Sequence, residues 1–289
     1  MQAGLQQLLN GISIGSIYAL VALGYTLVYG VLKLINFAHC DTMMIGALVG
    51  YLCCKCGMGF LPSVFVAMIA CILLGVTTEK LAYKPLRNSP RIMMLIAAIG
   101  VSLILQYSAM FFFGAEPHAF PPSVTGGIFT FGGVILSKSR LWVVLLAVTV
   151  MLLLTIVVGF TKMGKAMRAL ASDKEAAQLV GVNVDHTISV TFALGSALAG
   201  IAGVMLGSIF TVSPLMGVGM GVKTFAAAVL GGIGSIPGAM LGGLALGLIE
   251  TLIASLFGGA FKDALSFVIL IAVLLIKPSG ILGKRNVRD

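Results

Sequence analysis

Residues 8–54 read LLNGISIGSIYALVALGYTLVYGVLKLINFAHCDTMMIGALVGYLCC. The run 8–32 is long enough to cross a membrane, because a bilayer core about 30 Å thick requires roughly 20 apolar residues in a helix. A shorter apolar run, 38–54, follows it. A polar cluster lies between the two runs and at the start of the second one. It consists of Asn36, His39, Cys40 and Asp41. The pattern predicts a long span, a break at membrane depth and a short second helix.

The composition extends this prediction to the whole chain. The 289 residues are 59% hydrophobic and 9% charged, whereas soluble domains carry about 25% charged residues. The 37 glycines suit helices that approach one another closely in lipid and tolerate breaks there. We therefore expect an all-α polytopic membrane protein, with residues 1–289 forming a single transmembrane domain in contact with membrane lipid.

The remaining apolar runs predict the other spans. The run 222–257 is too long for one helix, and the breaker GGIGSIPG at 231–238 divides it. Together with the two runs at the N-terminus and the five further spans given next, this makes eight or nine membrane-embedded segments, two or three of them short or broken, and hence about eight transmembrane helices. The other expected spans are 61–82, 92–113, 141–160, 188–212 and 262–278.

Three groups of basic residues predict the orientation. Because loops that carry lysine and arginine stay in the cytoplasm, the segment 161–187 and the C-terminus are expected to be cytoplasmic and 114–140 external. The N-terminus is external if 38–54 is a full span. The same rule explains the net charge of +9, so no nucleic-acid partner is expected. The groups are Lys80, Lys84, Arg87 and Arg91; Lys162, Lys165, Arg168 and Lys174; and Lys277, Lys284, Arg285 and Arg288.

The second half of the chain repeats the pattern of the first. The span 188–212 is followed by Ser213 and Pro214, by the glycine-rich stretch LMGVGMGVK at 215–223, and by a short segment rich in Gly and Ala. The two units start from opposite sides, which indicates an inverted repeat, and interrupted segments at matching positions of such repeats mark a transporter's central site. The candidate residues for the translocation path or helix breaks are Asn36, His39, Asp41, Pro214, Gly217 and Gly219.

Charged side chains at membrane depth are expensive and are functional candidates. Asp41 has two compatible interpretations, as the N-cap of the following helix or as a group that lines the path. Glu79 is expected to form an interfacial pair with the adjacent Lys80, and Glu250 is ambiguous.

No cofactor or metal is expected, because the CxxC formed by Cys53 and Cys56 lacks half the ligands of a tetrahedral site. No paired acidic motif, HExxH sequence or nucleophile elbow is present. We therefore expect a protein that is not an enzyme and has no catalytic residue.

The segment 161–187 is the longest polar stretch on the expected cytoplasmic side. We expect one short amphipathic helix there, and its alanine-rich, mixed-charge composition favours a protein partner over the lipid surface. One face is expected to carry Met167, Leu170, Ala171, Ala177 and Val180. The nearby GFTKMGKA resembles a P-loop but has Ala166 where a hydroxyl is required. Energy is therefore expected from a partner or a gradient.

Residues 175–181, EAAQLVG, resemble the EAA-x-x-x-G loop by which permeases of ABC importers contact their ATPases. Other stretches resemble the branched-chain amino acid permeases, H type, over nearly the whole chain and in the same order. They are 10–39, MMIGA at 43–47, RALASDKEAAQLVGVNV at 168–184, and FAAAVLGGIGSIPGAMLGGLALGLIE at 225–250. Cys40 departs from that family, which has Gly there, and puts a tight turn at this point in doubt.

The resemblance implies a subunit of the bacterial inner membrane that imports leucine, isoleucine or valine. It implies a heterodimer with a second permease, two cytoplasmic ATPase subunits and an extracytoplasmic substrate-binding protein. The implied coupling residues are Arg168, Asp173, Glu175, Ala176, Ala177 and Gly181. The alternatives are a urea/amide or sugar permease of the same superfamily and a self-contained channel or ion-coupled transporter. For the last, Asn36, His39 and Asp41 would form the filter or ion site.

Overall fold

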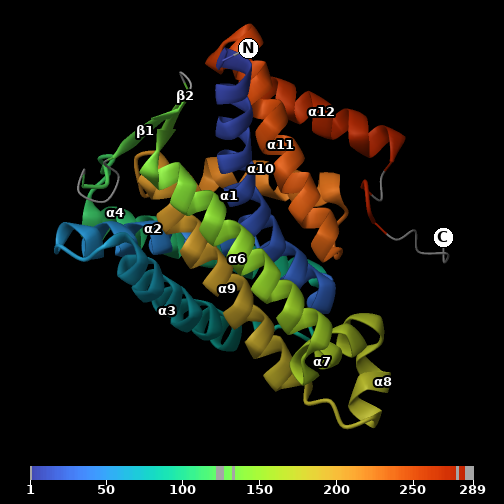
Figure 1. The fold of residues 1–289 in the computed structure, drawn as a ribbon. Helices are drawn as coiled ribbons and strands as arrows, with labels where there is room; N and C mark the ends of the chain where they lie inside the picture. The colour runs from blue at the N-terminus through green and yellow to red at the C-terminus, as the bar shows by residue number, and fades with distance from the viewer. Residues whose placement is uncertain (1, 122–126, 132–133, 278–279, 284–289) are drawn as a thin grey trace.

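A computed structural model describes residues 2–121, 127–131, 134–277 and 280–283, and most of them are helical (Figure 1). The helices are α1 Gln2–Leu32, α2 His39–Lys55, α3 Phe60–Thr78, η1 Glu79–Tyr83, α4 Arg91–Phe113, α6 Lys138–Phe160, α7 Lys162–Ser172, α8 Lys174–Leu179, α9 Val184–Ile209, α10 Met216–Gly231, α11 Ile236–Phe257, η2 Gly259–Phe261 and α12 Lys262–Ile276. A small antiparallel hairpin of β1 Ile128–Phe131 and β2 Val134–Ser137 lies in the segment expected to be external. The predicted all-α polytopic fold is confirmed, with this hairpin as an addition.

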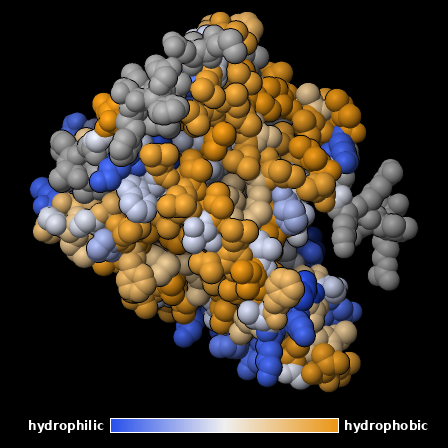
Figure 2. Space-filling model, in the orientation of Figure 1, coloured by the Kyte–Doolittle hydropathy of each residue, from blue (hydrophilic) through white to orange (hydrophobic). Residues whose placement is uncertain are grey.

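Six helices of the described residues are long and apolar enough to cross a membrane. Five of them match expected long spans, and the sixth, α11, is the second part of the divided run 222–257. The expected span 262–278 corresponds to α12, which has 15 residues and is not among the six. The sides of the molecule carry exposed apolar residues, including Phe111, which is 83% exposed, and Ile104, which is 65% exposed. Apolar side chains cover the middle of the molecule in Figure 2, and polar ones gather at the end formed by α7 and α8. The chain is a multi-pass membrane protein.

The breaks between helices lie close to the predicted positions. Lys33 adopts a left-handed conformation (φ 54°) just after α1. The predicted breaker at 231–238 is confirmed, because α10 ends at Gly231 and α11 begins at Ile236. Gly232 has φ 106°, and the Ser235 hydroxyl caps α11 by accepting a hydrogen bond from the Gly238 N–H. Local sequence therefore ends one helix and starts the next.

The two halves of the chain share an arrangement. The order long helix, break, short helix, long helix occurs in α1–α2–α3 and again in α9–α10–α11. Helix α1 packs closely on α11, and α9 packs closely on α3. Helix α1 runs toward the end of the molecule that carries α7 and α8, and α9 runs away from it (Figure 1). This is the arrangement expected of an inverted repeat.

One prediction about the second break is wrong. The stretch LMGVGMGVK does not extend the break, because Met216–Gly231 is a continuous helix and the break is confined to 210–215. Backbone groups at membrane depth must be paired, and a helix pairs them even in a glycine-rich sequence. The missing side chain at Gly217 allows α10 to approach α2, since a Cβ there would lie 2.5 Å from Asp41 Oδ1.

Candidate translocation and coupling sites

The first helix break is held by Asn36. Its buried side-chain oxygen Oδ1 accepts a hydrogen bond from the Ala38 N–H at 3.1 Å and another from the Tyr83 hydroxyl at 2.6 Å. The first of these bonds turns the chain into α2, as Asn side chains commonly do at turns. The second connects the break to η1, a π-helix at the end of α3.

Asp41 does not cap α2, so that interpretation is wrong. The N-cap is Ala38, without a side-chain capping bond, and Asp41 lies inside the first turn. Its carboxylate accepts hydrogen bonds from Ser102 Oγ at 2.5 Å and from Gln106 Nε2 at 3.0 Å, both on α4. Ser102 and Gln106 were missed in the sequence, although two polar residues one turn apart in an apolar span were a usable signal. They satisfy a carboxylate that is only 2% exposed.

His39 and Cys40 pack between α1 and α10. The His39 ring lies 4.9 Å from the Tyr25 ring and directly against Gly24, where a Cβ would be 2.2 Å from Nε2. That nitrogen has no hydrogen-bond partner among the described residues. Cys40 Sγ is 3.4 Å from both Tyr25 Oη and Thr224 Oγ1. Cys40 is helical, so no tight turn forms at this position.

The second break lies at the opposite end of the molecule from α7 and α8. Val212 forms a two-way backbone bridge with His118, in which both N–H···O distances are 2.8 Å. Pro214 is buried in this break. The other two residues predicted at this break lie in α10 instead: Gly217 packs against Asp41 in the first turn of α2, whereas Gly219 faces open space on an exposed side of α10. That side also carries Leu215, Val218 and Val222, each at least half exposed.

Two buried glutamates are paired with cations. Glu79 contacts Arg87, and not Lys80 as predicted, because Lys80 points to the surface while Glu79 is completely buried. Glu250 lies 2.9 Å from Lys223 Nζ and accepts a hydrogen bond from the Tyr18 hydroxyl at 2.6 Å. The ambiguity over Glu250 is thereby resolved, since it joins α1, α10 and α11 inside the protein.

The segment 161–187 forms two helices rather than the single helix predicted. Asp173 Oδ1 accepts hydrogen bonds from the N–H groups of Glu175 at 2.8 Å and Ala176 at 3.0 Å, and so starts a new helix. Aspartate is among the best N-cap residues, and its side chain competes with continuation of α7. Arg168 bonds the Val158 carbonyl near the end of α6, which fastens α7 to that span.

Gly181 ends α8 with a Schellman motif. It has φ 84°, its N–H bonds the Gln178 carbonyl, and the Val182 N–H bonds the Ala177 carbonyl, both at 3.0 Å. Only glycine adopts this conformation without steric cost.

The two helices present different surfaces to the protein and to solvent. Met167, Leu170 and Ala177 are buried against the body of the protein. Val180, predicted to share their face, is instead 77% exposed beside Leu179, which is 89% exposed. An apolar tip therefore projects from the polar end of the molecule (Figure 2).

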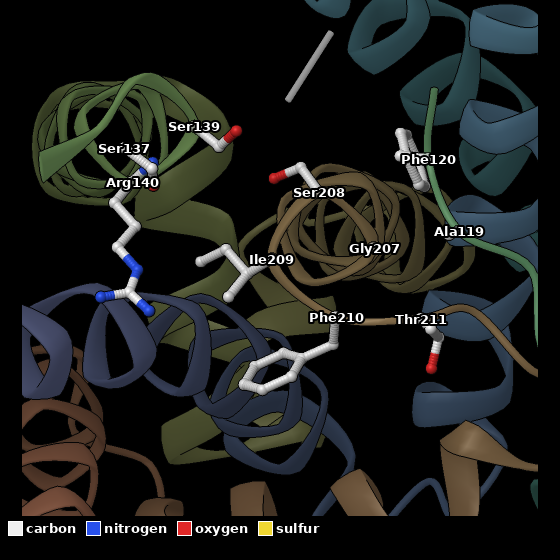
Figure 3. A pocket seen from close by; sticks show the side chains of 10 residues that line it. All are labelled: Ala119, Phe120, Ser137, Ser139, Arg140, Gly207, Ser208, Ile209, Phe210 and Thr211. Carbon is white, nitrogen blue, oxygen red and sulfur yellow. The ribbon is translucent and has the colours of Figure 1, made fainter. Parts of the chain in front are cut away.

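A cavity of about 580 Å³ lies between the start of α6 and the end of α9. Figure 3 shows Ser139 and Ser208 directed toward one another across this space, with Arg140 extending away from them. The cavity was not predicted. It adjoins the second break and includes Phe210 and Thr211 in its lining.

Comparisons with known proteins identify the family. Residues 7–274 match the sequence model described as branched-chain amino acid transport system / permease component. The permease protein BraD of the high-affinity branched-chain amino acid transport system of Pseudomonas aeruginosa is 42% identical, over 98% of this chain and 97% of BraD. The corresponding LivH of Escherichia coli K12 is 41% identical, over 98% of this chain and 96% of LivH.

More distant matches are partial or share only the fold. A sugar import permease matches over less than half of the chain. Among solved structures, PsaBC from Streptococcus pneumoniae in complex with Fab has the same fold, with a TM-score of 0.52 at 12% identity over 93% of this chain and 91% of that one. The chain belongs to the family of permease components of branched-chain amino acid transport systems.

Proposed function

We propose that this chain is one of two permease subunits of an ABC importer in a bacterial inner membrane, and that the importer moves leucine, isoleucine and valine inward. The other partners are two cytoplasmic ATPases and an extracytoplasmic binding protein. The observation that carries the proposal is the full-length similarity to BraD and LivH. The exposed apolar tip of α8 supports an external energy source, since a self-contained channel has no need of such a docking element.

The segment α7–α8 is the proposed ATPase dock. Arg168, Asp173 and Gly181 shape it through the contacts described above, and Ala177 anchors it in the core. Glu175 and Ala176 are exposed beside Leu179 and Val180. A short helix with an apolar tip inserts into a groove of a partner by the same contacts that helices use in other complexes.

The proposed path runs beside the short helices α2 and α10. Asp41, Ser102 and Gln106 form a polar group that is uncommon at membrane depth. The exposed side of α10 around Gly219 is apolar. A zwitterionic substrate with a branched aliphatic side chain requires both kinds of surface. We place the second permease opposite this side of α10, so that the path lies between the two subunits.

The orientation follows from the end that carries α7 and α8. Lys84 and Arg87 contact Asp185 at that same end, so basic residues from two loops gather there. The positive-inside rule makes this end cytoplasmic, and we propose that the C-terminus is cytoplasmic too. The cavity at the start of α6 then faces outward, toward the binding protein.

Co-purification tests the dock. We expect Leu179→Ser combined with Val180→Ser to reduce the ATPase recovered with the permease pair, while Lys55→Ser, an exposed change at the end of α2 and outside the dock, leaves recovery unchanged. The chain itself remains folded because both altered side chains are more than three-quarters exposed. Equal recovery from the two variants would contradict docking at α8.

A further inference from the structure

We propose that a chain of polar contacts transmits movement of the coupling segment to the first helix break. This polar relay consists of Asp185, Ser189, Arg87, Glu79, Tyr83 and Asn36. The proposal rests on the proposed docking of an ATPase at α8, and assigns to these residues the role of positioning the break during transport.

The relay begins in the first turn of α9, directly after α8 and its glycine cap. Asp185 Oδ1 accepts a hydrogen bond from Arg87 Nη1 at 2.5 Å, and its Oδ2 lies 2.7 Å from Lys84 Nζ. Asp185 is 56% exposed, so solvent weakens these bonds individually. They nevertheless join the start of α9 to the loop that follows η1.

The relay continues inward through Glu79. Arg87 uses its other terminal nitrogen to contact Glu79 Oε1, and Ser189 Oγ donates to Glu79 Oε2 at 2.7 Å. The Glu79 side chain is completely buried, so its charge depends on both partners. Ser189 lies one turn beyond Asp185 on α9. Two points of α9 are thus fastened to one buried carboxylate, and a shift of α9 must be followed by η1 or must break these bonds.

Helix η1 connects Glu79 to the first break. It is a π-helix of 5 residues that begins at Glu79 and ends at Tyr83, and such local insertions in helices occur often at functional sites. The Tyr83 hydroxyl donates to Asn36 Oδ1 at 2.6 Å, while the same oxygen accepts the Ala38 N–H that starts α2. Displacement of η1 therefore acts on the group that shapes the break beside Cys40 and Asp41.

The apolar residues around the relay are packed closely enough to transmit displacement. Tyr83 belongs to a core cluster separate from the main core of the protein, and its ring lies 5.2 Å from that of Phe192 on α9. The same cluster contains Leu170 of α7, Ala177 of α8 and Leu34 of the first break. Close-packed interiors transmit displacement. The coupling helices and the break thus share one compact core, through which the polar relay runs.

The test is Tyr83→Phe in the complete reconstituted importer, with Tyr107→Phe as the control. Tyr107 lies on α4 and is 66% exposed, and Tyr83→Phe keeps the ring while removing only the bond to Asn36. The readout is leucine moved per ATP hydrolysed. A hydrogen bond of ordinary net strength corresponds to a change of about two- to tenfold, so we expect this ratio to fall about two- to tenfold while assembly and ATP hydrolysis stay unchanged.

Ser189→Ala is a second test of the relay, because it removes one bond at the end that lies on α9, away from Asn36. We expect the double variant Ser189→Ala/Tyr83→Phe to lower the ratio no further than the more severe single variant, since Ser189→Ala weakens and Tyr83→Phe removes parts of one connection. Three results would overturn the relay. The effects of the two substitutions could multiply in the double variant, Tyr83→Phe could give the same leucine-to-ATP ratio as Tyr107→Phe, or Tyr83→Phe could lose assembly, transport and ATP hydrolysis together. Failure of the proposed function is distinguishable from failure of the relay, because the unaltered complex would then show no ATP-dependent leucine uptake.

Discussion

Replacing Lys223 by Met examines the buried ion pair between α10 and α11. The Lys223 and Glu250 side chains are 8% and 4% exposed, and their charged atoms lie 2.9 Å apart. Removing one member of a buried pair destabilises a protein by about 3–5 kcal/mol. Glu250 keeps Tyr18 as a donor and Lys262 Nζ at 3.4 Å, so we expect the lower end, about 3 kcal/mol. Because 1 kcal/mol shifts Tm by about 2–4 °C in a protein of this size class, Tm should fall by roughly 6–12 °C.

The assay is thermal unfolding of the purified chain, with two companion variants. Lys262→Met removes a cation whose side chain is 37% exposed, and we expect a loss of about 1 kcal/mol or less. In the double variant Lys223→Met/Glu250→Gln no charge remains unpaired at Glu250, and the amide oxygen still accepts the Tyr18 hydroxyl. Its Tm should therefore recover to within about 4 °C of the unaltered chain. A double variant as unstable as Lys223→Met, or equal Tm values for Lys223→Met and Lys262→Met, would show that the Lys223–Glu250 pair does not stabilise the fold in this way.

Three further predictions concern α10 and the coupling segment. Gly217→Ala places a methyl group 2.5 Å from Asp41 Oδ1, whereas Gly219→Ala meets nothing within 4 Å. Thermal unfolding should therefore show a loss of stability of about 1–3 kcal/mol for Gly217→Ala and none for Gly219→Ala. Equal Tm values for the two variants would contradict the α2–α10 contact. Gly181→Ala forces a side chain onto φ 84°, at about 1–2 kcal/mol, and should lower ATPase co-purification; undiminished recovery would show that the cap is unnecessary for docking. Asp173→Ala removes two capping bonds, worth about 1 kcal/mol, so amide exchange over α8 should quicken, while Asp173→Asn, which keeps a capping oxygen, should exchange as the unaltered chain does.

The sequence predicted the elements of the fold more successfully than the contacts between them. Apolar length alone identifies a membrane span, and the predicted run 92–113 corresponds to α4 Arg91–Phe113. The break at 231–238 was equally visible, because Gly and Pro mark chain reversals locally. Helix α10 was harder to predict, since its glycine-rich first half resembles a loop. Only the requirement that backbone groups inside a bilayer be paired indicates a helix there.

The partners of the buried polar groups could not be derived in the same way. Asp41 resembles an N-cap in sequence, but its donors come from α4, far along the chain. Glu79 adjoins Lys80, yet the packing of η1 against α9 turns it toward Arg87 and Ser189. These choices depend on which helices meet, and no local pattern contains that information. The split between α7 and α8 could have been predicted from the sequence, because Asp173 followed by helix-forming residues is itself a signal for a helix start.

We propose that this chain forms part of the membrane path of an importer driven by ATP hydrolysed on other subunits. The most direct test of this proposal is uptake of radiolabelled leucine into proteoliposomes that contain the permease pair, both ATPases and the binding protein. We expect uptake that requires both ATP and the binding protein. Isoleucine and valine should inhibit it, and neither urea nor sugars should affect it. Leucine flux through the permease pair alone, without ATPases or ATP, would contradict the proposal.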